Sequence, residues 1–259
     1  MDPPTTSRPG ADGTVTWRPH DGTDLSDLPL ALADLHRATP EEARVRLLLP
    51  VGVSRERAAD LVHGAGFAAD GPPTTGRGGL VVTGVRSHTL ADTVGPGMVL
   101  LVCGNNPSPA SAAAGVGYAR PGNRFWPAAL AAGIVPADRD ARAALAAGIG
   151  MTDLAKRPTR TAAEVTDAEC AEGLARVDRL TAWLRPGAVC FVGLSGWRSA
   201  ADPRAAAGRQ PGTVGGRPVY LMPSTSGLNA HATTADLARH LAAAAALGRA
   251  AQEGTSTGS

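Results

Sequence analysis

Short apolar runs alternate with amphipathic stretches along the second half of the chain. The runs have the length and composition of strands buried on both faces of a parallel sheet, and they cover residues 98–103, 188–193 and 218–223. Helical spacing of apolar residues separates or follows them, around 124–132, over 170–184 and over 234–247. This alternation predicts the α/β class with a parallel sheet.

The first half of the chain has a different pattern, which predicts a small α+β segment. Helical spacing covers residues 28–37, and a second helix over 55–63 begins after Ser54 and ends at Gly64 or Gly66. Residues 44–49 and 79–85 read as strands. We therefore predict an accessory segment over residues 26–94 and a larger domain over 95–250. Residues 1–25 and 251–259 are rich in Pro, Gly, Ser and Thr and are predicted to be disordered.

Composition narrows the class of protein. Hydrophobic residues make up 43% of the 259 residues, enough for a core, and the apolar runs are too short to span a membrane. Three scattered cysteines do not form a disulfide framework or a CxxC metal site. With no secretion signal visible, we expect a cytoplasmic protein. Residues 95–259 carry 16 Lys and Arg against 11 Asp and Glu, a mildly basic balance suited to a polyanion.

Ligands of parallel α/β sheets bind beyond the carboxyl ends of the strands, so three loops become candidates. The loop after Cys103 contains Asn105, Asn106, a glycine-rich stretch and Tyr118, and it lacks the pattern of a Walker A loop. An aromatic ring beside backbone amides suits a flat heterocycle. Phe125 and Trp126 follow, and we expect both in the core.

The other two loops allow further interpretations. The loop after Val192 reads Gly193-Leu-Ser-Gly-Trp, close to the nucleophile elbow of a serine hydrolase with Ser195, although Trp197 replaces the last glycine. Asp236 and His240 follow in an order that a triad could use. The loop after Met222 reads Pro-Ser-Thr-Ser-Gly-Leu-Asn, which suits contact with a sugar-phosphate backbone and an apolar wedge at Leu228; a turn with Leu228 buried is the alternative.

Four blocks in order resemble the mismatch-specific uracil-DNA glycosylase and thymine-DNA glycosylase family. They are Gly104-Asn-Asn-Pro, the segment from Gly115 to Trp126, Gly150-Met-Thr-Asp-Leu-Ala-Lys-Arg-Pro-Thr, and Met222-Pro-Ser-Thr-Ser-Gly-Leu-Asn. The resemblance covers about residues 95–248. It implies an α/β/α sandwich on a short parallel sheet and hydrolysis of the N-glycosidic bond of uracil mispaired with guanine in duplex DNA, with ethenocytosine as a further substrate. It implies a monomer that needs no cofactor or metal, and a role in base excision repair.

The resemblance also assigns residues. Asn106 falls on the catalytic asparagine, and base binding is implied for Gly104, Asn105, Gly117, Tyr118 and Asn123. Contacts to DNA are implied for Ser224, Ser226, Gly227, Leu228 and Asn229, with Leu228 filling the gap left by the flipped nucleotide. Asn123 is also suited to a purely structural role in its loop.

Three positions depart from the family pattern. Asn105 stands where relatives have Ile or Leu, and an arginine expected near the wedge is replaced by Asn229-Ala-His231. Asp153 stands where some relatives have lysine, and either a second polar group at the site or a helix cap fits it.

Two further interpretations stay open. A non-catalytic DNA- or nucleotide-binding module on the same fold is the alternative to the enzyme. Residues 28–86 resemble the C-terminal half of a class I methyltransferase without its glycine-rich cofactor loop, which fits a truncated remnant; an unrelated accessory domain fits equally.

Overall fold

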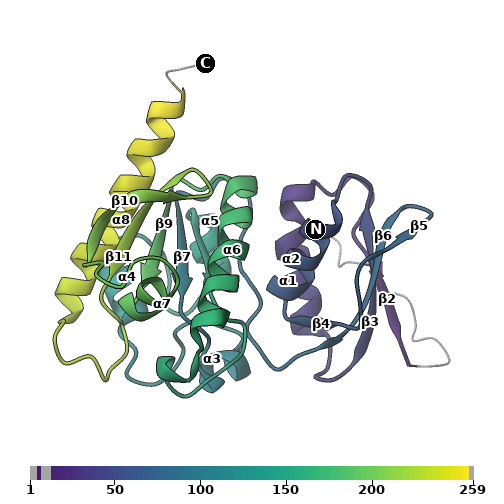
Figure 1. Cartoon of the computed structure of the whole chain (residues 1–259), viewed down its shortest axis with the longest axis horizontal. Coiled ribbons are helices and arrows are strands. Elements are labelled where there is room, and N and C mark those ends of the chain that lie inside the picture. The colour runs from purple at the N-terminus through teal and green to yellow at the C-terminus, as the bar shows by residue number, and fades with distance from the viewer. Residues whose placement is uncertain (1–4, 7–12, 257–259) are drawn as a thin grey trace.

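The computed structural model describes residues 5–6 and 13–256, which form two units that each have their own sheet (Figure 1). We call the part from β1 to β6 the N-terminal unit and the part from β7 to α8 the C-terminal unit. The predicted α/β class is therefore confirmed, with both units mixing helices and strands.

The C-terminal unit is built on a five-stranded sheet in the order β10-β11-β9-β7-β8. Four strands run parallel, and β10 is an antiparallel edge strand, which the prediction of a parallel sheet did not include. The bounds are β7 Leu100–Gly104, β8 Ile149–Asp153, β9 Ala188–Val192, β10 Gly208–Val214 and β11 Arg217–Met222. Strand β8 overlaps the start of the block at Gly150, which the sequence indicated as a motif and not as a strand.

Helices cover both faces of this sheet, which gives the predicted three layers. Buried residues of β7 alternate between the two cores: Leu100 and Val102 face one, Leu101 and Cys103 the other. Helices α4 Phe125–Ala131, α5 Ala141–Ala146 and α8 Thr234–Ser256 pack on the first face. Helices α6 Asp167–Leu184 and α7 Leu194–Ala200 pack on the second. The short elements α3 Pro109–Ala114 and η2 Ala162–Glu164 lie in loops.

The N-terminal unit packs two helices on one face of a mixed sheet. The strands follow the order β1-β2-β3-β6-β4, with β5 paired to β6, and only β2 and β3 are parallel. The strands are β1 Thr5–Thr6, β2 Val15–Arg18, β3 Arg44–Pro50, β4 Phe67–Ala69, β5 Thr74–Gly76 and β6 Gly79–Arg86. The helical elements are η1 Leu25–Asp27, α1 Leu28–Ala38 and α2 Arg55–Gly64. The predicted helix–strand–helix–strand order is present, while the methyltransferase resemblance stays a prediction.

Both predicted tails are too long. Strand β2 lies inside residues 1–25, and its Trp17 is fully buried in the core of the N-terminal unit, so a short strand was hidden by the surrounding polar residues. Helix α8 continues to Ser256, through most of the predicted C-terminal tail. Its Gln252 donates to the main-chain oxygen of Met98 at 3.0 Å, which ties this part of the helix to the domain.

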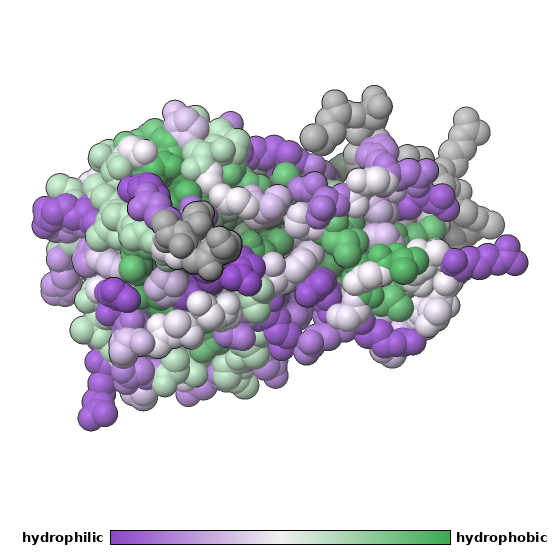
Figure 2. Space-filling model, turned by 90° about the horizontal axis from the view of Figure 1, so that it is seen from above, coloured by the Kyte–Doolittle hydropathy of each residue, from purple (hydrophilic) through white to green (hydrophobic). Residues whose placement is uncertain are grey.

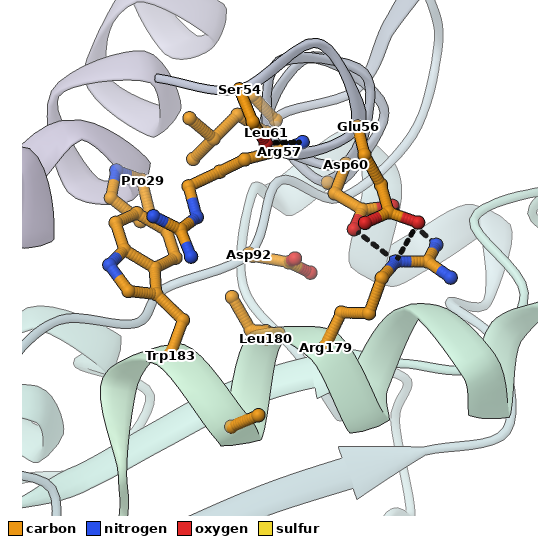
Figure 3. A pocket seen from close by; sticks show the side chains of 13 residues that line it. Pro29, Ser54, Glu56, Arg57, Asp60, Leu61, Asp92, Arg179, Leu180 and Trp183 are labelled. Atoms are coloured by element: carbon orange, nitrogen blue, oxygen red, sulfur yellow. Dashed lines mark hydrogen bonds and ion pairs between the residues drawn. The ribbon is translucent and has the colours of Figure 1, made fainter. Parts of the chain in front are cut away.

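The two units meet between α2 and α6, around a pocket of about 260 Å³ (Figure 3). Arg179 of α6 forms two hydrogen bonds to Asp60 of α2, both 2.7 Å long. The guanidinium of Arg57 lies over the ring of Trp183, with its carbon 4.5 Å from the ring centroid. Ion pairing and a cation–π contact therefore link the facing helices.

The linker between the units contributes a buried charge. The main-chain nitrogen of Asp92 donates to the main-chain oxygen of Gly64 at 2.9 Å. The carboxylate of Asp92 accepts three hydrogen bonds: from Lys156 at 2.8 Å, and from Arg176 and Thr152 at 2.7 Å each. Burial alone would raise the pKa of Asp92, but Arg176 and Lys156 outweigh it and hold the pKa at about 2. Asp92 thus connects to α2 through its main chain, and to β8, Lys156 and α6 through its carboxylate.

The surface mixes residue types. Seen from above, hydrophobic patches alternate with hydrophilic ones over both units (Figure 2). No helix among the described residues combines the length and the apolar character needed to cross a membrane.

Candidate functional site

A cavity of about 240 Å³ opens at the carboxyl edge of the five-stranded sheet in the C-terminal unit. The loops after β7, β8 and β11 and the linker between the units form its walls. Among the predicted site residues, the cavity is lined by Gly104, Asn105, Asn106, Gly117, Tyr118, Asn123, Asp153, Ser224, Ser226 and Leu228. Val192 also lines it, but the loop after β9 contributes little, whereas the loop after β8 was not among the three that we expected.

Asn106 lies in this cavity with a fixed amide. Its Nδ2 donates to Thr159 Oγ1 at 2.7 Å and to the main-chain oxygen of Pro107 at 2.9 Å, so both amide protons have acceptors. Its Oδ1 accepts from Asn105 Nδ2 at 3.3 Å, a long contact. A carbonyl oxygen has two lone pairs, so Oδ1 can accept a further hydrogen bond from a water molecule.

Asn105, the other candidate asparagine, turns toward a neighbouring helix. A Cβ on Gly196 of α7 would lie 2.2 Å from Asn105 Oδ1, and Cys170 Sγ lies 3.9 Å from the same oxygen. The glycine at position 196 therefore makes room for this amide. Asn105 shapes the cavity, and Asn106 is the better placed of the two for chemistry.

The side chains of Asp153 and Tyr118 both approach the Cα of Gly104. Gly104 and Asp153 are register partners at the ends of β7 and β8. A Cβ on Gly104 would lie 2.2 Å from Asp153 Oδ1 and 3.2 Å from Tyr118 Oη, so a larger residue does not fit. Burial raises the pKa of Asp153 to about 6 and raises that of Tyr118 well above its usual value. Asp153 ends a strand, so the helix-cap interpretation is wrong.

The ring of Tyr118, for which the resemblance implied base binding, also packs against the core. It stacks on Phe125 with centroids 4.1 Å apart and an interplanar angle of 17°. Phe125 and Trp126 are buried as predicted, and Trp126 Nε1 donates to the main-chain oxygen of Gly117 at 2.8 Å. Tyr118 has φ = 59°, in the left-handed region. A non-glycine residue there is uncommon and is held in place by its surroundings.

The loop after β11 is held by Arg124. The guanidinium donates to main-chain oxygens of Ser226 at 3.0 Å, Asn229 at 2.5 Å and Ala232. At the tip of this loop, Leu228 is 76% exposed, so the alternative of a buried leucine is wrong.

Three predicted residues lie beside the cavity rather than in it. Gly227 packs against another loop, where an added Cβ would lie 2.7 Å from the main-chain oxygen of Gly122. Asn229 donates to the main-chain oxygen of Ser224 at 2.8 Å and, with His231, lines a neighbouring pocket. Asn123, inside the cavity, accepts from the main-chain nitrogen of Phe125 at 2.9 Å, in line with a structural role.

The serine hydrolase interpretation is not supported by the arrangement of its residues. Ser195 is exposed on α7. Asp236 accepts from Thr233 at the start of α8, while His240 pairs with Tyr220 Oη at 2.9 Å. Among the described residues these three side chains therefore form no hydrogen-bonded triad.

Sequence reasoning missed three residues that shape the site. Thr159 orients Asn106, Arg124 fixes the loop that carries Leu228, and Leu90 lines the cavity from the linker. Arg124 and Thr159 stand inside two of the blocks that carried the resemblance, which was the available signal. Leu90 stands outside every block, and nothing in its local pattern indicates the cavity.

The fold and the cavity together define an α/β protein whose site suits a flat heterocyclic base. The family model of the Uracil DNA glycosylase superfamily matches residues 92–248. Because the match covers more than half of the chain, the chain belongs to this superfamily. Membership implies a DNA glycosylase-type activity and a DNA substrate.

Proposed function

We propose that this protein is a monofunctional DNA glycosylase that hydrolyses the N-glycosidic bond of uracil mispaired with guanine in duplex DNA and so initiates base excision repair. Ethenocytosine is a further candidate substrate. The observation that carries the proposal is the Asn106 amide: its protons are donated to Thr159 and Pro107, while its oxygen accepts one long contact from Asn105 and keeps a lone pair for a water.

An amide is too weak a base to deprotonate water, so its contribution is positional. A water that donates to Asn106 Oδ1 has its own oxygen directed away from the amide, toward the sugar C1′ of a nucleotide in the cavity. The water oxygen bonds to C1′ as the C1′–N bond breaks; the base leaves with the bonding electrons as an anion, and the proton that the water releases passes to that anion or to solvent. Positioning of the water and stabilisation of that anion then provide the rate enhancement.

The flipped nucleotide would enter past the loop that carries Leu228. This side chain is exposed at the rim, where an apolar residue can occupy the space that an extruded base leaves in the stack. Ser224 and Ser226 of the same loop can donate to phosphate oxygens. Arg124 supports this role because it holds the loop at three main-chain oxygens.

The test is base excision from a labelled duplex that contains one G·U pair, with A·U, G·T and single-stranded uracil as comparison substrates. Alkali cleaves each abasic site, and single-turnover rates are compared for wild type and Asn106→Ala. We expect a loss of at least about 100-fold in excision, with DNA affinity changed by less than about tenfold.

Gln210→Ala is the matched control. Gln210 lies on the edge strand β10, outside the cavity, and its amide donates to the main-chain oxygens of Ala206 and Gly208, so excision is expected to stay at the wild-type rate. DNA binding without excision on every substrate would contradict the proposal and favour the binding-module alternative.

A further inference from the structure

We propose that Asp153 determines which bases the cavity accepts by acting as a neutral carboxylic acid, whose O–H donates to a base carbonyl while its own C=O accepts from the adjacent ring N–H. The substrate class is thereby one of bases with a lactam edge, such as uracil. This inference rests on the proposed function.

The geometry directs Asp153 toward a ligand. It ends β8 beside Gly104, is 7% exposed, and lines the cavity together with Tyr118. Among the described residues, no side chain or main-chain group donates to its carboxyl oxygens. Tyr118 Oη, close to the same point above Gly104, is also buried without a partner in the described part of the chain. Buried polar groups normally have partners, so this unpartnered hydroxyl, beside a cavity-lining carboxyl that accepts no hydrogen bond within the described residues, indicates a place where a ligand supplies the partners.

The charged groups around Asp153 are already committed to one another. Lys156 follows β8, Arg176 comes from α6 and Asp92 from the linker, and both cations bond to the Asp92 carboxylate. Arg176 reaches only the main-chain oxygen of Asp153, at 2.8 Å. The remaining neighbours are Cys103 of β7 and Tyr118, both with a raised pKa, so they stay neutral.

These surroundings make the Asp153 carboxyl a weaker acid than an ordinary aspartate. Burial and Asp92 raise its pKa, Lys156 and Arg176 lower it, and the balance lies at about 6. Below that pH the group carries one donor and one acceptor, the pattern of an amide.

The chemistry of the proposed reaction requires the neutral form. The departing base carries a negative charge, and an ionised carboxylate in the same buried cavity would repel it strongly. An ionised Asp153 would also offer two acceptors to a base edge that has a carbonyl. A neutral acid avoids both conflicts and places its O–H where charge develops on the base.

The first experiment is the pH dependence of kcat/KM for G·U duplex between pH 5 and 8.5. Because the neutral fraction falls about tenfold per pH unit above the pKa, wild type should lose about 25-fold in kcat/KM between pH 5.5 and 7.5. Asp153→Asn keeps one donor and one acceptor, so its profile should be flat and its activity at pH 8 above that of wild type. Asp138→Asn, an exposed control, should reproduce the wild-type profile.

Two other results of this experiment would overturn the inference. If Asp153 instead deprotonated the attacking water, wild type would lose activity below pH 6 and Asp153→Asn would be inactive. Excision that is independent of pH in wild type would also overturn the inference, while leaving the proposed function standing.

A second measurement does not depend on excision. Calorimetric titration with free uracil at pH 7.5, in two buffers of different ionisation enthalpy, counts the protons taken up on binding. We expect close to one proton for wild type and none for Asp153→Asn, because about 97% of a group with pKa 6 is ionised at that pH. Binding without proton uptake, or no uracil binding by either protein, would overturn the inference even if no substrate is cleaved.

Discussion

Replacing Asp92 by asparagine tests how much one buried carboxylate, which anchors the linker to β8 and α6, contributes to stability. The carboxyl is 6% exposed, and its two cationic partners, Lys156 and Arg176, are each 5% exposed. Asparagine keeps the shape but leaves two buried positive charges without a counter-charge. Breaking a buried ion pair from one side costs about 3–5 kcal/mol.

The effect can be measured by equilibrium unfolding. A loss of this size corresponds to a fall of roughly 6–20 °C in Tm for a chain of this length. Asp70→Asn is the matched control, because it breaks an exposed ion pair with Arg44 and should cost about 0–1 kcal/mol. A cost for Asp92→Asn no larger than that of the control would refute the reasoning.

The dependence of the unfolding free energy on acidic pH provides an independent check, and its direction follows from the pKa of Asp92. The pKa of Asp92 is lower in the folded state, about 2, than its ordinary 3.8. Its contribution, roughly 2 kcal/mol, is therefore complete above pH 3.8 and is lost as the pH falls through 2. The difference in unfolding free energy between wild type and Asp92→Asn should shrink over that interval. In the variant, the two unpaired cations should also move the pH midpoint attributed to Asp153 downward.

Two further substitutions test the walls of the cavity. Gly196→Ala places a Cβ 2.2 Å from Asn105 Oδ1 and should lower excision of uracil at least about tenfold, while Gly212→Ala, which meets nothing within 4 Å, should leave the single-turnover rate unchanged. Leu90 lines the cavity, and its side chain lies 3.6 Å from an added Cβ on Gly117. Leu90→Ala should therefore raise the excision of thymine relative to uracil when G·T and G·U duplexes compete. An unchanged ratio would show that Leu90 does not limit the size of the base.

The local sequence pattern was sufficient to predict strands whose buried residues follow one another without interruption. The strands β7, β9 and β11 are short apolar runs, and the structure shifts their bounds by no more than two residues. Strand β8 was missed because Gly150, Thr152 and Asp153 interrupt its apolar character, although all of it is buried. Strand β2 was missed because four residues in a polar stretch carry no period, and only Trp17 anchors them.

Site residues that stand within contiguous sequence motifs could be predicted from the sequence. Asn106 and Tyr118 were found in this way, whereas the hydrogen bond that fixes the Asn106 amide comes from Thr159, a separation of 53 residues. The state of Asp153 was also beyond local pattern. Its pKa depends on burial and on Asp92, Lys156 and Arg176, which come from three different elements.

The linker shows why the N-terminal unit belongs to any account of the site. Leu90 lines the cavity although it precedes the matched residues 92–248, and it is fixed on both sides. Ser87 and Asp92 bond to main-chain oxygens of Gly66 and Gly64 in the N-terminal unit, while Thr93 pairs with Met151 of β8. A shift of α2 against α6 would therefore move the cavity wall at Leu90. The contacts between the units thus set the shape of the space in which a base would bind, even though the catalytic candidates all lie in the C-terminal unit.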